Sequence, residues 1–293
     1  MARLIRAGGP RGRSTPPARA ALVRSLRFLQ HLRGWRRLAL ALCGRKGHFV
    51  VSDGETRFEG DLASHIDREV YLFGAYEADN ICLFLDSVDR RGVALDIGAN
   101  VGNHSILFAR AFDRVHAFEP NPGLWAKLER NIALNHLHNI MVHRIGAADK
   151  QGSFPLFDVD GDNQGLATFL NVEQYERPLR QIGTARTEAL DDYLADERID
   201  AVKIDVQGWE PQVLKGMRRI LERDRPVVWT EVGDGTLGQT PGRAALEALF
   251  PYTIVLKRFE TTVGALARRA MLSYYTKTEL EPGDYIVFPA DPE

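Results

Sequence analysis

The residue types best suited to chemistry in this chain are an aspartate, two glycines and a glutamate around one predicted turn. Residues 93–102 read Val-Ala-Leu-Asp-Ile-Gly-Ala-Asn-Val-Gly, and Glu119 follows seventeen positions after Gly102. This pattern predicts a strand that delivers Asp96 and Gly98 into a tight turn, a helix that begins at Gly102, and a second strand that ends at Glu119. Glycine lets the backbone approach a ligand closely, and a carboxylate at the tip of the second strand suits ribose hydroxyls. We therefore expect a nucleoside to bind at this turn.

The spacing of the glycines separates this turn from dinucleotide sites. The pattern here is D-x-G-x-x-x-G, whereas dinucleotide folds use G-x-G-x-x-G to cradle a pyrophosphate. A NAD-dependent oxidoreductase is therefore disfavoured. A nucleoside without a pyrophosphate, such as S-adenosylmethionine, fits the turn better.

Strands and helices are expected to alternate along most of the chain. We expect strands at 93–97, 114–119, 139–145, 153–158, 201–206 and 226–231, near 252–257 and at 284–289, and helices at 102–111, 122–135, 209–221 and 242–249. A hairpin around Asp53-Gly54 and one helix from Arg68 to Val88 should precede them. Such alternation predicts an α/β fold whose mostly parallel sheet is covered on both faces and binds ligands at the strands' carboxyl ends.

Several further segments accompany the turn, and together they resemble the FkbM family of class I methyltransferases. The segments that carry the resemblance are 95–102, 117–122, 147–150, 202–210, 214–216 and 226–231. The likeness covers about residues 74–232. It implies a Rossmann-like three-layer sandwich with an antiparallel closing strand, and S-adenosylmethionine as the cofactor.

The residues expected to hold the cofactor belong mainly to the turn and to the strand ends. Backbone at the turn should approach the methionine portion, Asp96 should orient its ammonium, and Glu119 should take the ribose hydroxyls. Asp149 either contacts the adenine amino group or caps a turn. The complete expected set is Asp96, Gly98, Ala99, Asn100, Gly102, Glu119, Asp149 and Glu77.

Two side chains are candidates for catalysis. Asp205 should end a strand beside the transferable methyl group, where it would accept a proton from a substrate hydroxyl; the alternative is a structural ion pair. Lys203 interrupts the same strand and, if buried, needs a partner, with Glu231, Glu210 or Glu77 as candidates. His104, in the first turn of the helix, is a second candidate base. We expect no metal site, because the histidines share no ligand spacing and only Cys43 and Cys82 occur.

The charge distribution bears on partners. The 293 residues have a net charge of −1, yet residues 1–46 contain twelve Lys or Arg and no acid. The rest then carries 26 basic and 39 acidic side chains, which disfavours a nucleic-acid substrate. Two cysteines and no apolar run long enough to cross a bilayer lead us to expect a cytoplasmic protein.

The chain ends and one long connection leave alternatives open. We expect a basic extension (1–46), a helical cap (47–90) and the methyltransferase domain (91–293, with its FkbM-like core at about 93–232). A helix from Ala21 to about Leu42, with a Leu22, Leu26 and Leu29 stripe, docks on its own domain, contacts an anionic membrane or acts as a targeting peptide. Residues 158–186 form either a surface excursion or edge hairpin, or a substrate-facing flap.

The resemblance implies O-methylation of a hydroxyl on a small molecule, a glycan or a lipid-linked saccharide. One alternative is N-methylation of nucleic acid, although the Asn/Asp-Pro-Pro-Tyr signature of such enzymes is replaced by Asp205-Val206-Gln207-Gly208. The other alternative is a membrane-associated protein that binds the cofactor without turnover. The intact turn and Glu119 weigh against that reading.

Overall fold

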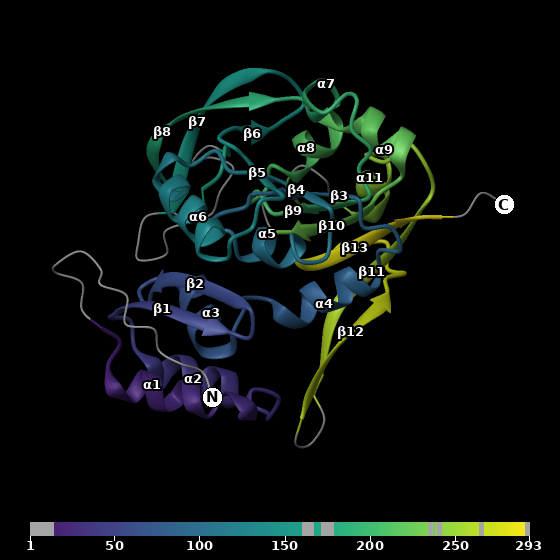
Figure 1. Cartoon of the computed structure of the whole chain (residues 1–293). Helices are drawn as coiled ribbons and strands as arrows, with labels where there is room; N and C mark the ends of the chain where they lie inside the picture. Colours follow the sequence, from purple (N-terminus) through teal and green to yellow (C-terminus); the bar gives the residue numbers. More distant parts are fainter. Residues whose placement is uncertain are drawn as a thin grey trace.

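The computed structural model describes most of the chain. The described residues are 15–159, 167–170, 179–233, 236, 238, 242–263 and 267–290. They form a large mixed sheet between two layers of helices, with a smaller unit of helices and a hairpin below it in the view of Figure 1.

The large sheet has the strand order β12-β11-β13-β10-β9-β3-β4-β5. Its members are β3 (Val93–Ile97), β4 (Arg114–Phe118), β5 (Ile140–His143), β9 (Ala201–Ile204), β10 (Val227–Val232), β11 (Ile254–Val263), β12 (Arg268–Tyr274) and β13 (Gly283–Pro289). The five strands from β10 to β5 are parallel, and β13 closes them antiparallel to β10. This architecture confirms the predicted fold class and adds β12, a strand that we did not expect.

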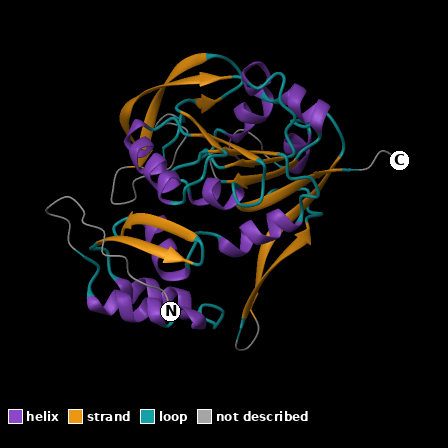
Figure 2. Ribbon diagram, viewed as in Figure 1, coloured by secondary structure: helices purple, strands orange, loops and turns teal. Residues whose placement is uncertain are grey.

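Helices cover both faces of this sheet (Figure 2). One layer contains α4 (Ala78–Asp86), α5 (Asn103–Phe108) and α6 (Pro122–Leu134), and the other contains α7 (Leu190–Tyr193), α8 (Glu210–Gly216), α9 (Arg218–Asp224) and α11 (Arg243–Glu247). Strands β3 and β9 are buried along most of their length because both layers pack on them. At the start of α6, the Asn121 side chain caps the helix by accepting from the Gly123 N–H, and Pro122 occupies the first helical position.

A three-stranded sheet forms part of the long connection after β5. Its strands are β6 (Gly146–Ala147), β7 (Gly152–Val159) and β8 (Leu179–Glu188), with β7 and β8 antiparallel. The described part of the segment 158–186 thus contains a hairpin, and it also contributes Ala167 and Phe169 to the lining of the cavity described below, as expected of a substrate-facing flap. Residues 160–166 and 171–178 lie outside the described residues.

The N-terminal unit contains two helices that were predicted as one. In place of a helix over 21–42, the structure has α1 (Ala18–Ser25), a 3-10 turn η1 (Arg27–Leu29) and α2 (Trp35–Cys43). The first helix ends at Ser25 and the 3-10 turn at Leu29. Gly34, in a left-handed conformation at φ 80°, is the N-cap of α2, which packs back on α1. Beside them lie β1 (His48–Asp53), β2 (Thr56–Asp61) and α3 (His65–Phe73).

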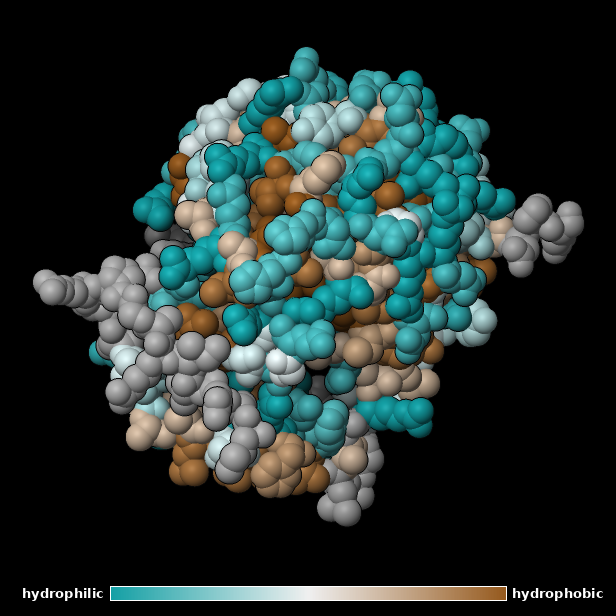
Figure 3. All heavy atoms as spheres, viewed as in Figure 1, coloured by the Kyte–Doolittle hydropathy of each residue, from teal (hydrophilic) through white to brown (hydrophobic). Residues whose placement is uncertain are grey.

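The leucine stripe expected on this helix is not its buried face. Leu22 is 63% exposed, whereas Ala20, Val23 and Arg24 are buried. The reason is that α1 packs against α3, where the Arg24 guanidinium donates to the Tyr71 carbonyl. Apolar side chains consequently remain on the outer side of α1 and α2, along the lower edge of Figure 3.

A second predicted helix is also divided. The segment 68–88 contains the end of α3 and all of α4, separated by Gly74 at φ 97° and Glu77 at φ 55°. These left-handed residues turn the chain, so Tyr76 and Glu77 lie in a connection and not on a helix. The buried cluster of the N-terminal unit continues into Val101 and Ile106, beside the glycine turn. The expected division at residues 46 and 90 stays a prediction.

Candidate active site

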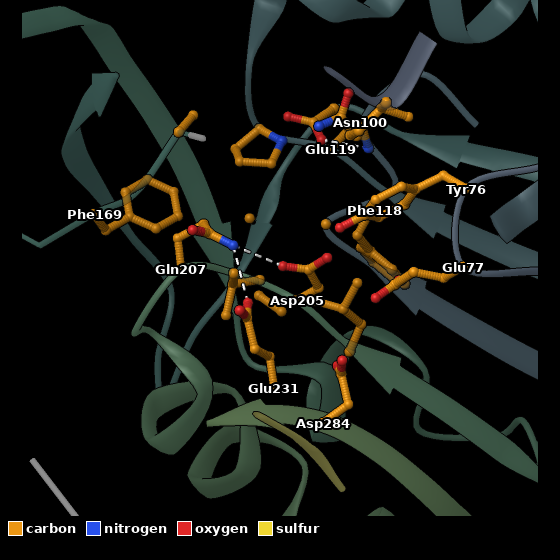
Figure 4. Close-up of a pocket in the computed structure, with 18 of the residues that line it drawn as sticks. Tyr76, Glu77, Asn100, Phe118, Glu119, Phe169, Asp205, Gln207, Glu231 and Asp284 are labelled. Carbon is orange, nitrogen blue, oxygen red and sulfur yellow. Dashed lines mark hydrogen bonds between the residues drawn. The ribbon is translucent and has the colours of Figure 1, made fainter. Parts of the chain in front are cut away.

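A cavity of about 250 Å³ lies where the carboxyl ends of β3, β4 and β9 meet (Figure 4). Its walls come from distant parts of the chain, including the connection before α4, the β6 region and the start of β13. The polar side chains that line it are Ser64, His65, Tyr76, Glu77, Asn100, Glu119, Asp205, Gln207, Glu231 and Asp284.

The glycine turn forms one wall and is held by close backbone packing. The N–H groups of Gly98 and Ala99 both donate to the Phe118 carbonyl at 2.9 Å. Gly98 has φ 88°, and a Cβ there would lie 1.9 Å from the carbonyl oxygen of Asp205. Glycine is therefore required at position 98 because the ends of β3 and β9 lie in direct contact there. This reason is independent of the expected close approach of a ligand to the turn.

Glu119 presents a carboxylate that is fixed before any ligand binds. Its two oxygens accept the backbone N–H groups of Asn100 and Asn121, each at 2.8 Å. Burial raises the pKa of Glu119 to about 7, although these two hydrogen bonds act in the opposite direction. Each oxygen keeps a second acceptor position, as recognition of two neighbouring ribose hydroxyls requires.

The other predicted cofactor residues divide into two groups. Gly98, Asn100, Glu119 and Glu77 line the cavity, whereas Asp96, Ala99, Gly102 and Asp149 are not part of its lining. Asp96 is fully buried behind the turn; it accepts from the Ser105 hydroxyl, and its Oδ1 has no protein partner. Asp149 is exposed beyond the end of β6, and Gly146 and Ala147 occupy the wall instead. The expected contact between Asp149 and adenine is therefore not supported.

Lys203 is paired within its own strand end, and not with the acids proposed from the sequence. Its Nζ lies 3.1 Å from Asp205 Oδ2, and its side chain is only 2% exposed. Burial alone would raise the pKa of Asp205, but the Lys203 ammonium and the Gln207 amide hold it below its usual range. An ion-paired carboxylate of low pKa is a weak base. The structure therefore favours a structural ion pair between Lys203 and Asp205 over a role of Asp205 as the catalytic base.

Two carboxylates at this end of the cavity were not among our predicted site residues. Glu231, at the end of β10, accepts from the Gln207 amide at 3.0 Å, and Asp284, at the start of β13, accepts from the Trp229 indole at 3.0 Å. The two are register partners across the antiparallel pair. Burial, with the nearby Glu77 charge second, raises the pKa of Asp284 to about 7, and burial also raises the pKa of Glu231.

Glu77 is held in place by the start of α5. Asn103 Oδ1 and Nδ2 pair with the backbone N–H and carbonyl of Tyr76, both at 3.0 Å, and His104 Nε2 lies 3.1 Å from Glu77 Oε2. Burial raises the pKa of Glu77 to about 7, with the Lys203 charge opposing it, and Asp284 lies within hydrogen-bonding reach. Glu77 and Asp284 thus form a carboxyl pair that titrates near neutral pH.

His104 is not placed to act on a substrate. It is 6% exposed, it is not part of the cavity lining, and it packs between Tyr76 and Trp229. Burial, assisted by Lys203, lowers the pKa of His104 to about 3, so the ring is neutral at physiological pH. Its role here is to position Glu77, and our prediction of a general base at this residue is not supported.

The carboxylates of the cavity do not form a metal site by geometry. Among the described residues, no group of three or more His, Cys, Asp or Glu side chains could hold a metal ion. The donor set fits a nucleoside cofactor because Glu119 lines the cavity and is prearranged for ribose. Asp96 lies outside the lining, so it can act on a positively charged amino-acid portion only through its charge.

Comparisons with known proteins agree with this site. A profile of the FkbM methyltransferase domain matches residues 96–249. The 2-O-methyltransferase NoeI of Sinorhizobium fredii is 29% identical over 180 residues, covering 56% of this chain and 73% of NoeI. The hexuronic acid methyltransferase AglP of Haloferax volcanii is 28% identical over 172 residues, covering 59% of this chain and 68% of AglP.

Among solved structures, the methyltransferase FkbM from Methylobacillus flagellatus aligns over 92% of this chain and 59% of that chain, with a TM-score of 0.43 and 16% identity. The family profile spans more than half of the chain, including the glycine turn, Glu119 and the Asp205 strand end. The chain belongs to the FkbM family of S-adenosylmethionine-dependent methyltransferases.

Proposed function

We propose that this enzyme methylates a hydroxyl group of a neutral saccharide. The observation that carries the proposal is the convergence of four carboxylates on one end of the cavity: Glu77, Asp205, Glu231 and Asp284. Carboxylate oxygens accept hydrogen bonds from hydroxyls, and a sugar offers several hydroxyls in fixed directions. Above pH 7, where Glu77 and Asp284 ionise, their charges repel an anionic acceptor, whereas Lys203 offsets the charge of Asp205; this gives the site a means of discrimination.

Relatives support an acceptor of this general kind. One is named a 2-O-methyltransferase and another a hexuronic acid methyltransferase. A hexuronic acid carries a carboxylate, which the acidic end of this cavity would repel, so we assign a neutral sugar to this chain. The phosphates of a nucleic acid would meet the same repulsion.

In this proposal the turn and Glu119 hold the cofactor. Bound S-adenosylmethionine supplies a methyl group on a positively charged sulfur, so the enzyme's main contribution is alignment of the two reactants, worth about 7–11 kcal/mol when it is good. Gly98 and Asn100 line the cavity beside Glu119, where their backbone can contact the cofactor. Asp96, behind the turn, adds negative potential toward the cofactor's ammonium.

We assign the proton of the acceptor hydroxyl to the Glu77–Asp284 pair. A general base works best when its pKa is near the operating pH, and the pKa of both groups is raised to about 7. Asp205 has a lowered pKa and is bonded to Lys203 and Gln207, so it would orient the hydroxyl more than deprotonate it. His104 keeps Glu77 in position.

The test is a methyl-transfer assay with labelled S-adenosylmethionine and three matched acceptors: neutral methyl glycosides, the corresponding uronides and the corresponding amino sugars. We expect turnover on the neutral sugars and an O-linked product methyl by NMR. Preference for the uronide, or an N-linked methyl on the amino sugar, would contradict the proposal.

Variants separate the roles of the carboxylates. Asp284→Asn should lower turnover by ~10²–10⁴-fold while leaving the cofactor affinity nearly unchanged. Asp205→Asn should have the smaller effect. Glu222→Gln, which removes an exposed acid on α9, is the control. A larger loss in Asp205→Asn would return the base to Asp205.

A further inference from the structure

The outer side of the N-terminal helices carries apolar side chains that the fold does not bury. Of the nine large apolar side chains exposed in the described part of the chain, five belong to this short segment. They are Leu22 (63% exposed), Phe28 (70%), Leu32 (43%), Leu38 (51%) and Leu42 (46%). We call this set the N-terminal face; it follows the lower edge of Figure 3, where α1 and α2 lie in Figure 1.

These side chains are not needed to hold the helices in place. The inner sides of α1 and α2 are already packed, through Ala20, Val23, Ala39 and Cys43, all at most 6% exposed. Leu38 and Leu42 are four residues apart and share one outward stripe of α2. A cluster of exposed large apolar side chains is costly in water, so it indicates a surface that is covered in use.

The charges around the N-terminal face identify what covers it. Exposed cations surround the apolar residues, namely Arg19, Arg33, Arg37, Arg45 and Lys46. No acid occurs in residues 1–46. Of the acids on neighbouring elements, Asp53 pairs with Arg27, Glu69 pairs with Arg36, and Asp79 lines the adjoining cavity. Apolar side chains among an excess of positive over negative side chains fit the interface of an anionic lipid bilayer, whereas a second copy of this chain would bring the same positive charge.

We propose that the N-terminal face docks the enzyme onto an anionic lipid surface. Phe28 and the four leucines enter the headgroup region, and the arginines and Lys46 contact lipid phosphates. In the described residues, no helix is long and apolar enough to cross a membrane, so attachment by this face is peripheral.

The N-terminal face adjoins a second polar cavity that shares one lining residue, Glu77, with the active-site cavity. This cavity of about 190 Å³ is lined by Gln30, His31 and Arg36 of the N-terminal segment, by Thr261 and by Glu77. Gln30 and His31 lie between Phe28 and Leu32 in the chain, and Glu77 also lines the cavity that holds Asp205. Docking would therefore bring the lipid surface to the side of the enzyme where Glu77 lines both cavities, and a neutral sugar carried on a lipid becomes the favoured acceptor. This last step rests on the proposed function, whereas the docking does not.

The experiment is co-sedimentation of the full-length protein with vesicles at low salt. Vesicles of phosphatidylcholine alone are compared with vesicles that also contain phosphatidylglycerol. Two variants probe the surface: Phe28→Ser/Leu38→Ser/Leu42→Ser removes apolar contacts, and Arg33→Glu/Arg37→Glu reverses charge. Met141→Ser, which replaces a 42% exposed side chain on β5, is the matched control.

We expect binding only to the anionic vesicles, with a loss of about tenfold or more in both variants and none in the control. Unchanged S-adenosylmethionine binding by calorimetry shows that each variant is folded and keeps a failure of docking separate from a failure of the proposed function. Wild-type protein that ignores anionic vesicles overturns the proposal, as does an apolar variant that binds like wild type. A wild-type dimer that the apolar variant dissociates, without vesicle binding, would assign the face to self-association instead.

Discussion

Replacing Glu119 by glutamine changes the charge and one hydrogen-bonding group of a side chain whose surroundings are otherwise fixed. In the wild type each carboxylate oxygen accepts one backbone N–H at 2.8 Å, from Asn100 or Asn121. A glutamine keeps one acceptor oxygen but points an NH₂ group at the other N–H. The cofactor then loses one charge-assisted acceptor, which costs about 1.5–3 kcal/mol, or roughly 10–150-fold in Kd.

The pH dependence makes this prediction specific. Because burial raises the pKa of Glu119 to about 7, the wild-type carboxylate is protonated below that pH and resembles the amide. Wild-type affinity should therefore fall as pH decreases through 7, by up to tenfold per pH unit, while the variant stays flat by comparison. The ratio of the two Kd values should be large at pH 8 and approach one near pH 5.

The assay is calorimetric titration with S-adenosylmethionine, and with its demethylated product, across this pH range. Glu222→Gln serves as the control for removal of an exposed charge and should match the wild type throughout. The other buried acids are common to both proteins and cancel in the ratio. A ratio that stays constant between pH 5 and 8, or a variant that binds as tightly as the wild type at pH 8, would refute the assignment of Glu119.

Three further variants test the site. Gly98→Ala should destabilise the fold by more than Gly54→Ala. Both positions have positive φ, which costs about 1–2 kcal/mol for alanine, but only the Cβ at position 98 meets a carbonyl oxygen, at 1.9 Å. Equal losses of unfolding free energy in urea would contradict this prediction. Lys203→Met should lower the free energy of unfolding by about 3–5 kcal/mol because Asp205 and its acidic neighbours lose their buried cation. An unchanged free energy of unfolding would argue against the ion pair. Asp284→Asn should stabilise the free enzyme relative to wild type above pH 7. The pKa of Asp284 in the folded protein is raised to about 7. Its contribution to the free energy of unfolding is therefore complete below about pH 4 and is lost as the pH rises to 7, by at most about 1.4 kcal/mol per pH unit. A difference in unfolding free energy between variant and wild type that does not depend on pH would refute this prediction.

The parallel part of the sheet and the cofactor wall were predictable because local sequence determines them. Strand β3, its glycine turn and the acid after β4 lie within 27 residues, and each adjoins the next in the fold. Apolar runs that end in Asp, Gly or Glu mark strands whose tips meet at one edge. Prediction was weaker where one residue bends an otherwise helical pattern. Gly34 and Gly74 were predicted inside helices, although both adopt positive φ: Gly74 ends α3 and Gly34 precedes α2.

The side chain of Asp205 illustrates a different limit. Its position at the end of β9 was predictable, but its chemistry depends on Lys203 two residues earlier and on the Gln207 amide. The sequence indicated that Lys203 needs an acidic partner, yet it did not say which of several acids is nearest. Since the ion pair lowers the pKa of Asp205, the partner decides whether this carboxylate is a base or a hydrogen-bond acceptor.

Asp284 was missed although a rule about strand direction could have found it. Ligands bind at the carboxyl ends of parallel strands, but an antiparallel strand in the same sheet begins at that edge. The family resemblance already implied such a closing strand, and the structure pairs its first residues, Gly283 and Asp284, with Val232 and Glu231 at the end of β10. An acid at the start of an antiparallel closing strand is therefore as strong a candidate for the site as an acid at the end of a parallel one, and Asp284 faces Glu77 for this reason.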